Sequence, residues 1–159
     1  MNIRVGFGSD IHQLKEGKDF FIGGVKIHHI KGAIGHSDAD VLIHAICDAC
    51  LGAVGLRDIG YQFPDTNDTY KGFDSKELLK EVINMISKKG WKVINIDSVI
   101  HLEKPKLADY IPEMRNILAV ILRISSDNIS IKAKTSEMIG FVGREEGVKA
   151  EAVVLLVSE

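Results

Sequence analysis

Hydrophobic and polar residues alternate along several segments of the chain with a period of two, which is typical of strands with one buried face. Such strands are predicted at residues 2–7, 91–102 and 129–135. Residues 148–157 predict a last strand that is apolar enough on both faces to be largely buried. Two further apolar runs flank a pair of glycines within residues 20–27, and this pattern predicts a tight hairpin.

Apolar residues at helical spacing predict three helices. The first runs from Asp38, a favourable N-cap, to about Gly55. The second begins at Asp74 or Ser75, and the third has Pro112 in its first turn. Because the helices alternate with the strands, the order predicts an α/β fold.

The expected form of this fold is an α+β sandwich, in which helices pack on one face of a mixed sheet with a small hairpin beside it. The chain shows no repeat, low-complexity tract or linker, so residues 1–159 are expected to form one domain. Turn residues without a period predict loops at 58–68 and 134–147. Such loops often carry functional side chains.

Composition limits the classes of partner. The chain has a formal net charge of −2 and a pI near 6.3, so nothing favours a nucleic-acid backbone or an anionic membrane as partner. The longest apolar run, residues 117–122, is too short to span a bilayer. Met1 leads directly into a predicted strand, and a cytoplasmic protein is therefore expected.

The cysteines, Cys47 and Cys50, form a CxxC motif in the middle of the first helix. A redox CxxC normally opens a helix, where the N-terminus lowers the pKa of the thiol. The mid-helix position favours small core residues over a redox pair.

The first helix also carries a polar row. Asp40, His44 and Asp48 stand one turn apart, so that carboxylates flank an imidazole. Carboxylates that fix the tautomer of a histidine are typical of metal sites. A solvated helix face has the same spacing, and the helix alone does not distinguish the two interpretations.

A second polar pair follows the first strand. If the chain stays extended beyond Phe7, Asp10 and His12 project on the same side, and Gly6 and Gly8 permit another segment to approach closely. A DxH pair alone is more often a surface feature. Together with a histidine such as His44, it gives an Asp-His-His set that suits zinc and leaves a fourth position open, as in catalytic sites.

Five segments in order resemble one family: GFGSDIH, HSDADVLIHAICDACLGAVGLRDIG, FPDT, PKLADYIPEMR and KAKTSEMIGFVGREEG. They are similar to the 2-C-methyl-D-erythritol 2,4-cyclodiphosphate synthases of the non-mevalonate isoprenoid pathway, over essentially the whole chain. The resemblance implies a homotrimeric phosphorus–oxygen lyase with active sites at the subunit interfaces. Its implied reaction cyclises 4-diphosphocytidyl-2-C-methyl-D-erythritol 2-phosphate, a nucleotide substrate, and releases CMP.

The resemblance also implies residue roles. Asp10, His12 and His44 match zinc ligands, one ion per subunit, and Glu137 matches a ligand of Mg²⁺ or Mn²⁺ that also binds the substrate diphosphate. His36 and Thr135 match groups that stabilise the transition state. The other implied substrate contacts are Ser37, Asp58, Ile59, Gly60, Phe63, Pro64, Asp65, Lys106, Leu107, Ala108, Lys134, Ser136, Phe141 and Arg144.

One position departs from the family pattern. Ser9 stands where some members have an aromatic residue lining an axial cavity for isoprenoid diphosphates, beside the arginine that Arg144 matches. With a serine there, Arg144 is instead expected to pair with Glu146 or Glu151 across the trimer axis. Two other functions remain as alternatives: a zinc-dependent phosphoesterase and a non-catalytic trimeric binding module.

Overall fold

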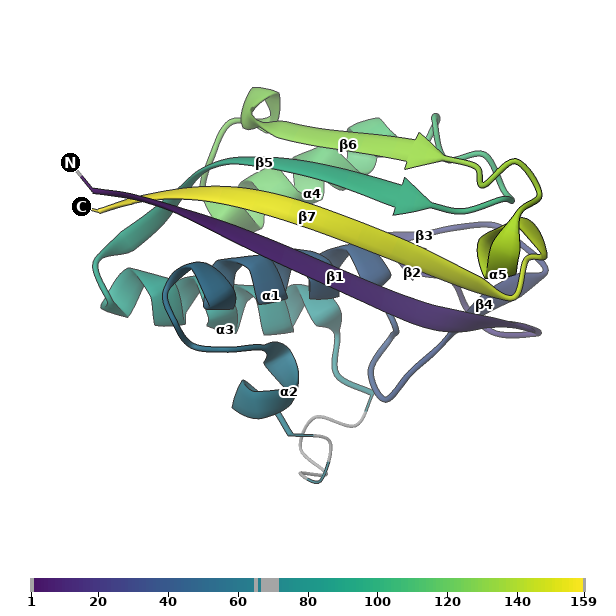
Figure 1. The fold of residues 1–159 in the computed structure, drawn as a ribbon, viewed down its shortest axis with the longest axis horizontal. Coiled ribbons are helices and arrows are strands. Elements are labelled where there is room, and N and C mark those ends of the chain that lie inside the picture. Colours follow the sequence, from purple (N-terminus) through teal and green to yellow (C-terminus); the bar gives the residue numbers. More distant parts are fainter. Residues whose placement is uncertain (1, 65, 67–71, 159) are drawn as a thin grey trace.

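The fold is taken from a computed structural model that describes residues 2–64, 66 and 72–158. A five-stranded sheet has the order β4-β1-β7-β5-β6 (Figure 1). In this order its strands are Lys31–Ile34, Ile3–Glu16, Gly147–Ser158, Trp91–His101 and Ile129–Lys134. The pair β5 and β6 is parallel and the other pairs are antiparallel, which confirms the predicted mixed sheet.

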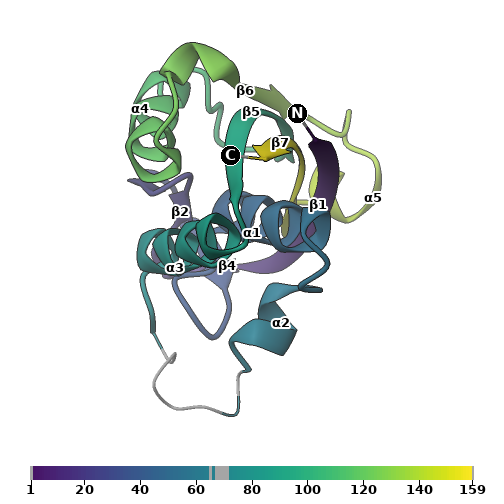
Figure 2. The same ribbon diagram turned by 90° about the vertical axis from the view of Figure 1, so that its left-hand side faces the viewer.

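Three long helices cover one face of this sheet (Figure 2). They are α1 (Val41–Ala53), α3 (Ser75–Lys88) and α4 (Ile111–Leu122). The predicted hairpin is also confirmed: β2 (Phe21–Ile22) and β3 (Val25–Lys26) flank two glycines that both adopt positive φ. The expected arrangement of helices on one face of a mixed sheet is therefore correct.

The hydrophobic pattern did not predict the shortest elements. The single-turn helices α2 (Ile59–Gln62) and α5 (Gly140–Gly143) lie in segments predicted as loops, and a 3₁₀ turn covers Ser126–Asn128. Strand β4 was not predicted either. Elements of three or four residues are too short to display a period.

The core lies between the sheet and the helices, and α1 is its centre because almost every side chain of this helix is buried. Cys47 and Cys50 are both fully buried there, and burial raises the pKa of the Cys50 thiol to about 12. A thiol so shielded is not a redox nucleophile, which confirms the packing interpretation. Among residues 2–64, 66 and 72–158, no helix is long and apolar enough to cross a membrane.

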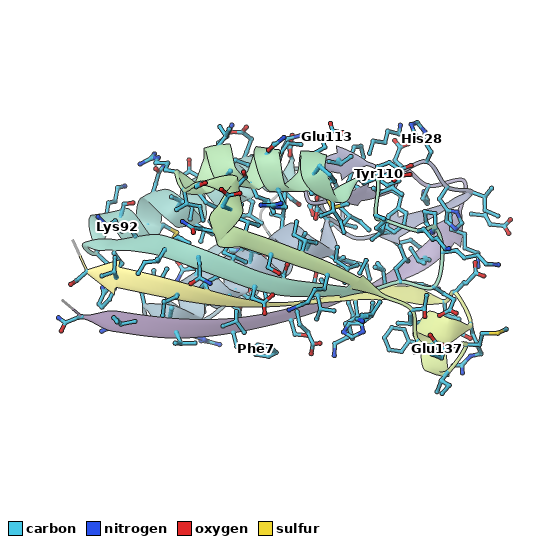
Figure 3. The ribbon with its side chains drawn as sticks, turned by 90° about the horizontal axis from the view of Figure 1, so that it is seen from above. Phe7, His28, Lys92, Tyr110, Glu113 and Glu137 are labelled. Atoms are coloured by element: carbon cyan, nitrogen blue, oxygen red, sulfur yellow. The ribbon has the colours of Figure 1, made fainter. Side chains whose placement is uncertain are left out.

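In the part of the chain that the structure describes, no layer of helices covers the opposite face of the sheet. Along β1 the side chains of Ile3, Val5, Phe7 and Ile11 are all more than half exposed, and Val153 on β7 joins them. Figure 3 shows Phe7 projecting away from the helices on this side. We refer to these five residues as the open apolar face.

Candidate metal centre

Two glycines bring α1 directly onto β1. A Cβ atom built on Gly6 would lie 1.9 Å from the carbonyl oxygen of Ala49, and one built on Gly8 would lie 2.0 Å from that of Ala45. Any side chain at either position would push the helix away from the strand. The close approach predicted for these glycines is thus confirmed, and it brings His44 down to β1.

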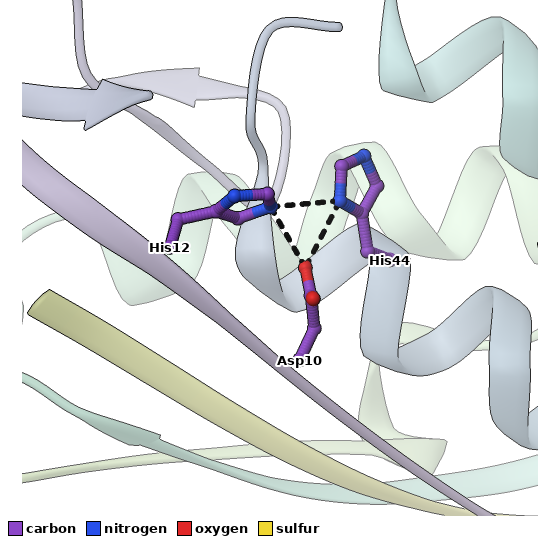
Figure 4. Close-up of side chains that lie close together, drawn as sticks. All are labelled: Asp10, His12 and His44. Carbon is purple, nitrogen blue, oxygen red and sulfur yellow. Dashed lines mark hydrogen bonds and ion pairs between the residues drawn. The ribbon is translucent and has the colours of Figure 1, made fainter. Parts of the chain in front are cut away.

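Asp10 and His12 continue the same side of β1 beyond the glycines, because the strand runs to Glu16 without a break. The Oδ2 atom of Asp10 lies 2.8 Å from Nε2 of His12 and 3.0 Å from Nδ1 of His44. The two imidazole nitrogens are 3.1 Å apart (Figure 4). The three donor atoms therefore converge on one point, and this group is the one in the described chain that is able to share a metal ion.

The outer nitrogens of both imidazoles have partners that suit metal binding. Nδ1 of His12 lies 3.0 Å from the carbonyl oxygen of Ile34, which only accepts hydrogen bonds. Nε2 of His44 lies 2.9 Å from the hydroxyl of Ser75, whose own proton is donated to Asp38. These partners can accept protons from the outer nitrogens, and Ser37 Oγ also lies 3.1 Å from Nε2 of His44, so each inner nitrogen would be free to offer a lone pair to a bound cation. The residues present fit a metal ion.

The electrostatics of the cluster agree with this geometry. Burial alone would raise the pKa of the Asp10 carboxyl, but hydrogen bonds from His12 and His44 outweigh burial and hold that pKa well below its usual range. Burial alone would lower the pKa of His44, but the Asp10 carboxylate outweighs it and raises that pKa. Asp10 is therefore ionised at neutral pH, as a ligand must be.

The carboxylates one turn before and one turn after His44 hydrogen-bond to backbone amides, not to its imidazole. Asp40 is the N-cap of the helix and accepts a hydrogen bond from the backbone N–H of Ile43. Its carboxylate also accepts from the backbone N–H groups of Gly23 and Gly24 in the hairpin turn. Asp48 accepts from the N–H of Ile59 at 2.8 Å and so fixes α2. The spacing left two interpretations open, and it cannot show that a carboxylate is already bonded to a backbone amide.

Asp38 was assigned wrongly as the cap of α1. Its carboxylate accepts from the backbone N–H and the hydroxyl of Ser75, the first residue of α3. It therefore joins the start of α3 to the loop before α1. Asp38, Ser75 and His44 form a hydrogen-bonded chain that ends at the metal cluster, and no sequence pattern indicated it.

A cavity of about 330 Å³ opens beside the cluster. Of the predicted site residues, the structure places eight around it: the metal-ligand candidate His44 and the predicted substrate contacts Asp10, His12, His36, Ser37, Ile59, Gly60 and Phe63. His36 is exposed, whereas the metal ligands are more enclosed. Asp58 caps α2 instead, by accepting from the N–H of Tyr61 at 2.8 Å, and Pro64 is exposed. Asp65 lies outside the described residues.

A second cavity, of about 320 Å³, is lined by five other predicted residues: Lys106, Leu107, Ala108, Lys134 and Thr135. Within the part of the chain that the structure describes, no residue lines both cavities. One chain alone therefore does not join the two groups of predicted residues into one pocket.

Besides Asp58 and Pro64, four predicted residues line neither cavity. Ser136 and Glu137 lie in the turn after β6, where Glu137 is exposed and accepts a hydrogen bond from the Thr135 hydroxyl at 2.9 Å. Phe141 belongs to α5. Arg144 forms a two-point ion pair with Glu146 at 2.9 and 3.1 Å. Glu146 is one of the two predicted partners, but the pair lies within one chain and not across a trimer axis as predicted. Glu151 contacts His101 and Lys149 instead.

Comparison with known proteins identifies the family. The model of the YgbB family matches residues 3–157, nearly the whole chain. The chain belongs to the YgbB family.

Named members of the YgbB family agree with this assignment. The 2-C-methyl-D-erythritol 2,4-cyclodiphosphate synthase of Bacteroides fragilis is 55% identical over 156 residues, covering 98% of each chain. A solved structure of a synthase of that name in a CDP-bound form has 37% identity and a TM-score of 0.90, covering 97% of this chain and all of that one. The solved structure of the bifunctional IspDF of Campylobacter jejuni has 39% identity and a TM-score of 0.95. The match covers 99% of this chain and 43% of that larger protein.

Sequence reasoning missed several residues that shape the cavities of this YgbB-family chain. Phe73 and Leu78 line the first cavity, and Leu102 and Glu103 line the second. Leu78 lies in the apolar stripe of α3. In the sequence, an apolar residue that lines a cavity cannot be distinguished from one that packs in the core. Motif spacing likewise gave no signal for Ser75.

Proposed function

We propose that the chain is a cytoplasmic 2-C-methyl-D-erythritol 2,4-cyclodiphosphate synthase, a phosphorus–oxygen lyase acting as one domain over residues 1–159. It converts 4-diphosphocytidyl-2-C-methyl-D-erythritol 2-phosphate into the cyclic diphosphate and releases CMP. The observation that carries this proposal is the convergence of Asp10, His12 and His44 beside a cavity, in a chain 55% identical to a synthase of that name.

The reaction needs no nucleophilic side chain, because both reacting groups belong to one molecule. An oxygen of the 2-phosphate attacks the β-phosphorus, the bond from that phosphorus to the oxygen bridging it to the α-phosphorus breaks, and the electron pair leaves with CMP. The chain acts by holding the two groups in line, which is worth several orders of magnitude in rate. His36 and Ser37 line the cavity, and this position supports a role for both in binding phosphate oxygens.

Two metal sites support this chemistry. Asp10, His12 and His44 supply one oxygen and two nitrogens, a donor set that suits Zn²⁺, with one ion per subunit. Glu137 provides an exposed carboxylate for Mg²⁺ or Mn²⁺ together with the substrate diphosphate. When bound, such cations offset the repulsion between phosphate groups and stabilise the charge that develops during transfer.

The proposed homotrimer explains why the predicted site is divided between two cavities. In a cyclic assembly each interface joins two different surfaces, so the first cavity of one copy can meet the second cavity of the next. The cytidine half, at Lys106, Leu107 and Ala108, then comes from the neighbouring subunit. The open apolar face supports such an assembly, because exposed apolar patches of this kind mark association surfaces.

The test is CMP release from the diphosphocytidyl substrate by purified protein, before and after removal of zinc, with phosphorus NMR of the product. A cyclic diphosphate that forms only with metal supports the proposal. An acyclic phosphate would identify a zinc phosphoesterase. A chain that neither binds zinc nor releases CMP would instead be a binding module.

His36 has a separate test because it lines the cavity without belonging to the metal cluster. As a hydrogen-bond donor to the transition state, it is expected to contribute about 10²–10³-fold to turnover. His36→Ala should therefore lower kcat by roughly this factor while the zinc content stays at the wild-type level. Loss of zinc in this variant would contradict the role.

A further inference from the structure

The turn that follows β6 has an unusual backbone. Glu137 and Met138 are consecutive residues with φ of 51° and 63°, in the left-handed region. Residues with a Cβ atom are disfavoured there, and two in succession need other interactions to hold them. Neither is a glycine or an asparagine, the residues that adopt this region most readily. The conformation is therefore imposed by contacts around the turn.

One carboxylate supplies the main contacts. Oε2 of Glu103 accepts a hydrogen bond from the backbone N–H of Ser136 at 3.0 Å, and Oε1 accepts one from the N–H of Met138 at 3.2 Å. The two amides lie on either side of Glu137. Successive N–H groups in such a turn form a concave anion-binding nest, and hydrogen bonds to an ionised carboxylate are stronger than neutral ones. Glu103 therefore holds the backbone on both sides of Glu137.

The turn also orients two side chains. The Thr135 hydroxyl donates to Oε1 of Glu137 at 2.9 Å, so the residues matched to transition-state stabilisation and to the second metal are in contact. The Ser136 hydroxyl donates to the carbonyl oxygen of Ile139 and closes the turn. Moving the backbone between Ser136 and Met138 would therefore move both the Thr135 hydroxyl and the Glu137 carboxylate.

The backbone next to Glu103 is held by the sheet. Glu103 lies two residues beyond the end of β5, next to Leu102, whose N–H donates to the carbonyl oxygen of Lys134 at 2.9 Å. Glu103 also lines the second cavity with the Lys106 loop. A single half-buried side chain thus links the wall of this cavity to the turn that carries Glu137.

We propose that Glu103 is a positioning residue that clamps residues 136–138, so that Thr135 and Glu137 are presented to the substrate phosphates in one fixed arrangement. The inference rests on the proposed function for the roles of Thr135 and Glu137. The clamp itself rests only on the two hydrogen bonds and the left-handed backbone. Neither the family motifs nor the sequence patterns assign any role to Glu103.

Glu103→Ala removes both acceptors and should lower kcat by about 10–100-fold, because small displacements of catalytic groups have effects of this size. Substrate KM and zinc content should stay close to wild type, because the nucleotide loop and the Asp10 cluster keep their own contacts. The Mg²⁺ concentration required for half-maximal turnover should rise. Glu103→Gln keeps one acceptor oxygen, so its kcat should lie between those of the wild type and Glu103→Ala.

Glu113→Ala is the matched control, because it removes an exposed glutamate on α4 (Figure 3). It should leave kcat and the Mg²⁺ requirement unchanged. A rise in KM with unchanged kcat in Glu103→Ala would overturn the proposal, since Glu103 would then only shape the nucleotide cavity. Unchanged kinetics would overturn it as well.

A rescue experiment separates positioning from general damage. Glycine adopts positive φ without a Cβ penalty, so Met138→Gly should let the turn keep its shape without the clamp. The double variant Glu103→Ala/Met138→Gly should regain about fivefold in kcat over Glu103→Ala, the size of a single-residue preference. A double variant no faster than Glu103→Ala would count against the clamp.

A readout independent of activity distinguishes this inference from the proposed function. The amide protons of Ser136 and Met138 should be protected from hydrogen exchange in the wild type and lose that protection in Glu103→Ala, measured by NMR. Protection that persists in Glu103→Ala overturns the clamp even if the enzyme is a synthase. Wild-type protein that releases no CMP overturns the proposed function, while the exchange result still decides the clamp.

Discussion

The two cavities differ in how their polar groups are held. The first lies beside the buried α1 and β1, and its three metal ligands converge within a single chain. The second lies at the ends of β5 and β6, where Lys106, Lys134 and Thr135 are exposed. The comparison shows that the residues able to hold a metal converge within one chain, whereas the second cavity is bordered by exposed side chains. Under the proposed function, this second cavity is the nucleotide half, which a neighbouring subunit would enclose.

The largest effect is expected from breaking the first cavity. His12→Ala removes one of three convergent donors, so zinc should be lost and turnover should fall by at least roughly 10²–10³-fold. Zinc content by atomic absorption and CMP release measure the two effects. His28→Ala, which changes an exposed histidine, is the control and should retain both. Full zinc occupancy in His12→Ala would exclude the assigned ligand set.

Mixing two inactive variants tests whether the cavities of different subunits cooperate. His12→Ala leaves the second cavity intact, and Thr135→Ala leaves the first intact. If each active site uses one cavity from each of two subunits, random mixing by unfolding and refolding should restore about one quarter of wild-type turnover. Two variants that stay inactive after mixing would place both halves of the site in one chain.

Ser75 tests the support behind the metal ligands. Ser75→Ala removes the hydroxyl that accepts from Nε2 of His44, and loss of such a partner typically weakens metal affinity by about 10–100-fold. A competition assay with a chromogenic chelator measures the zinc Kd. Ser98→Ala is the matched control, since it removes another buried serine hydroxyl, from β5. Equal zinc affinity in the two variants would show that the contact between Ser75 and His44 does not strengthen zinc binding.

The smallest effect is a dependence of stability on pH that zinc should reverse. Because Asp10 raises the pKa of His44 above 6.5, protonated His44 stabilises the metal-free fold below that pH and the contribution is lost as pH rises through the raised pKa. Metal-free protein should therefore unfold at a higher temperature near pH 6 than near pH 8. Zinc-loaded protein should show the opposite order, because protons compete with zinc for the histidines. Thermal unfolding of both forms decides this.

Several features of the site were predictable from local sequence. Gly6 and Gly8 indicated a close backbone approach, and the alternation of Asp10 and His12 placed both side chains on one side of a strand. These predictions hold because strand geometry fixes which face a residue occupies. By contrast, the spacing of Asp40 and Asp48 left open whether they contact His44, and both bind backbone amides. Spacing describes what a side chain can reach, and tertiary contacts decide what it binds.

By itself, the sequence determined the three long helices, most of the strands and the candidate ligands Asp10, His12 and His44, because periodicity and residue chemistry act over a few neighbouring positions. Only the tertiary structure decided that Asp38 reaches His44 through Ser75, and that Glu103 holds the turn around Glu137. Both arrangements join residues more than thirty positions apart by hydrogen bonds. No local pattern encodes such pairs, because the packing of whole strands and helices brings them together.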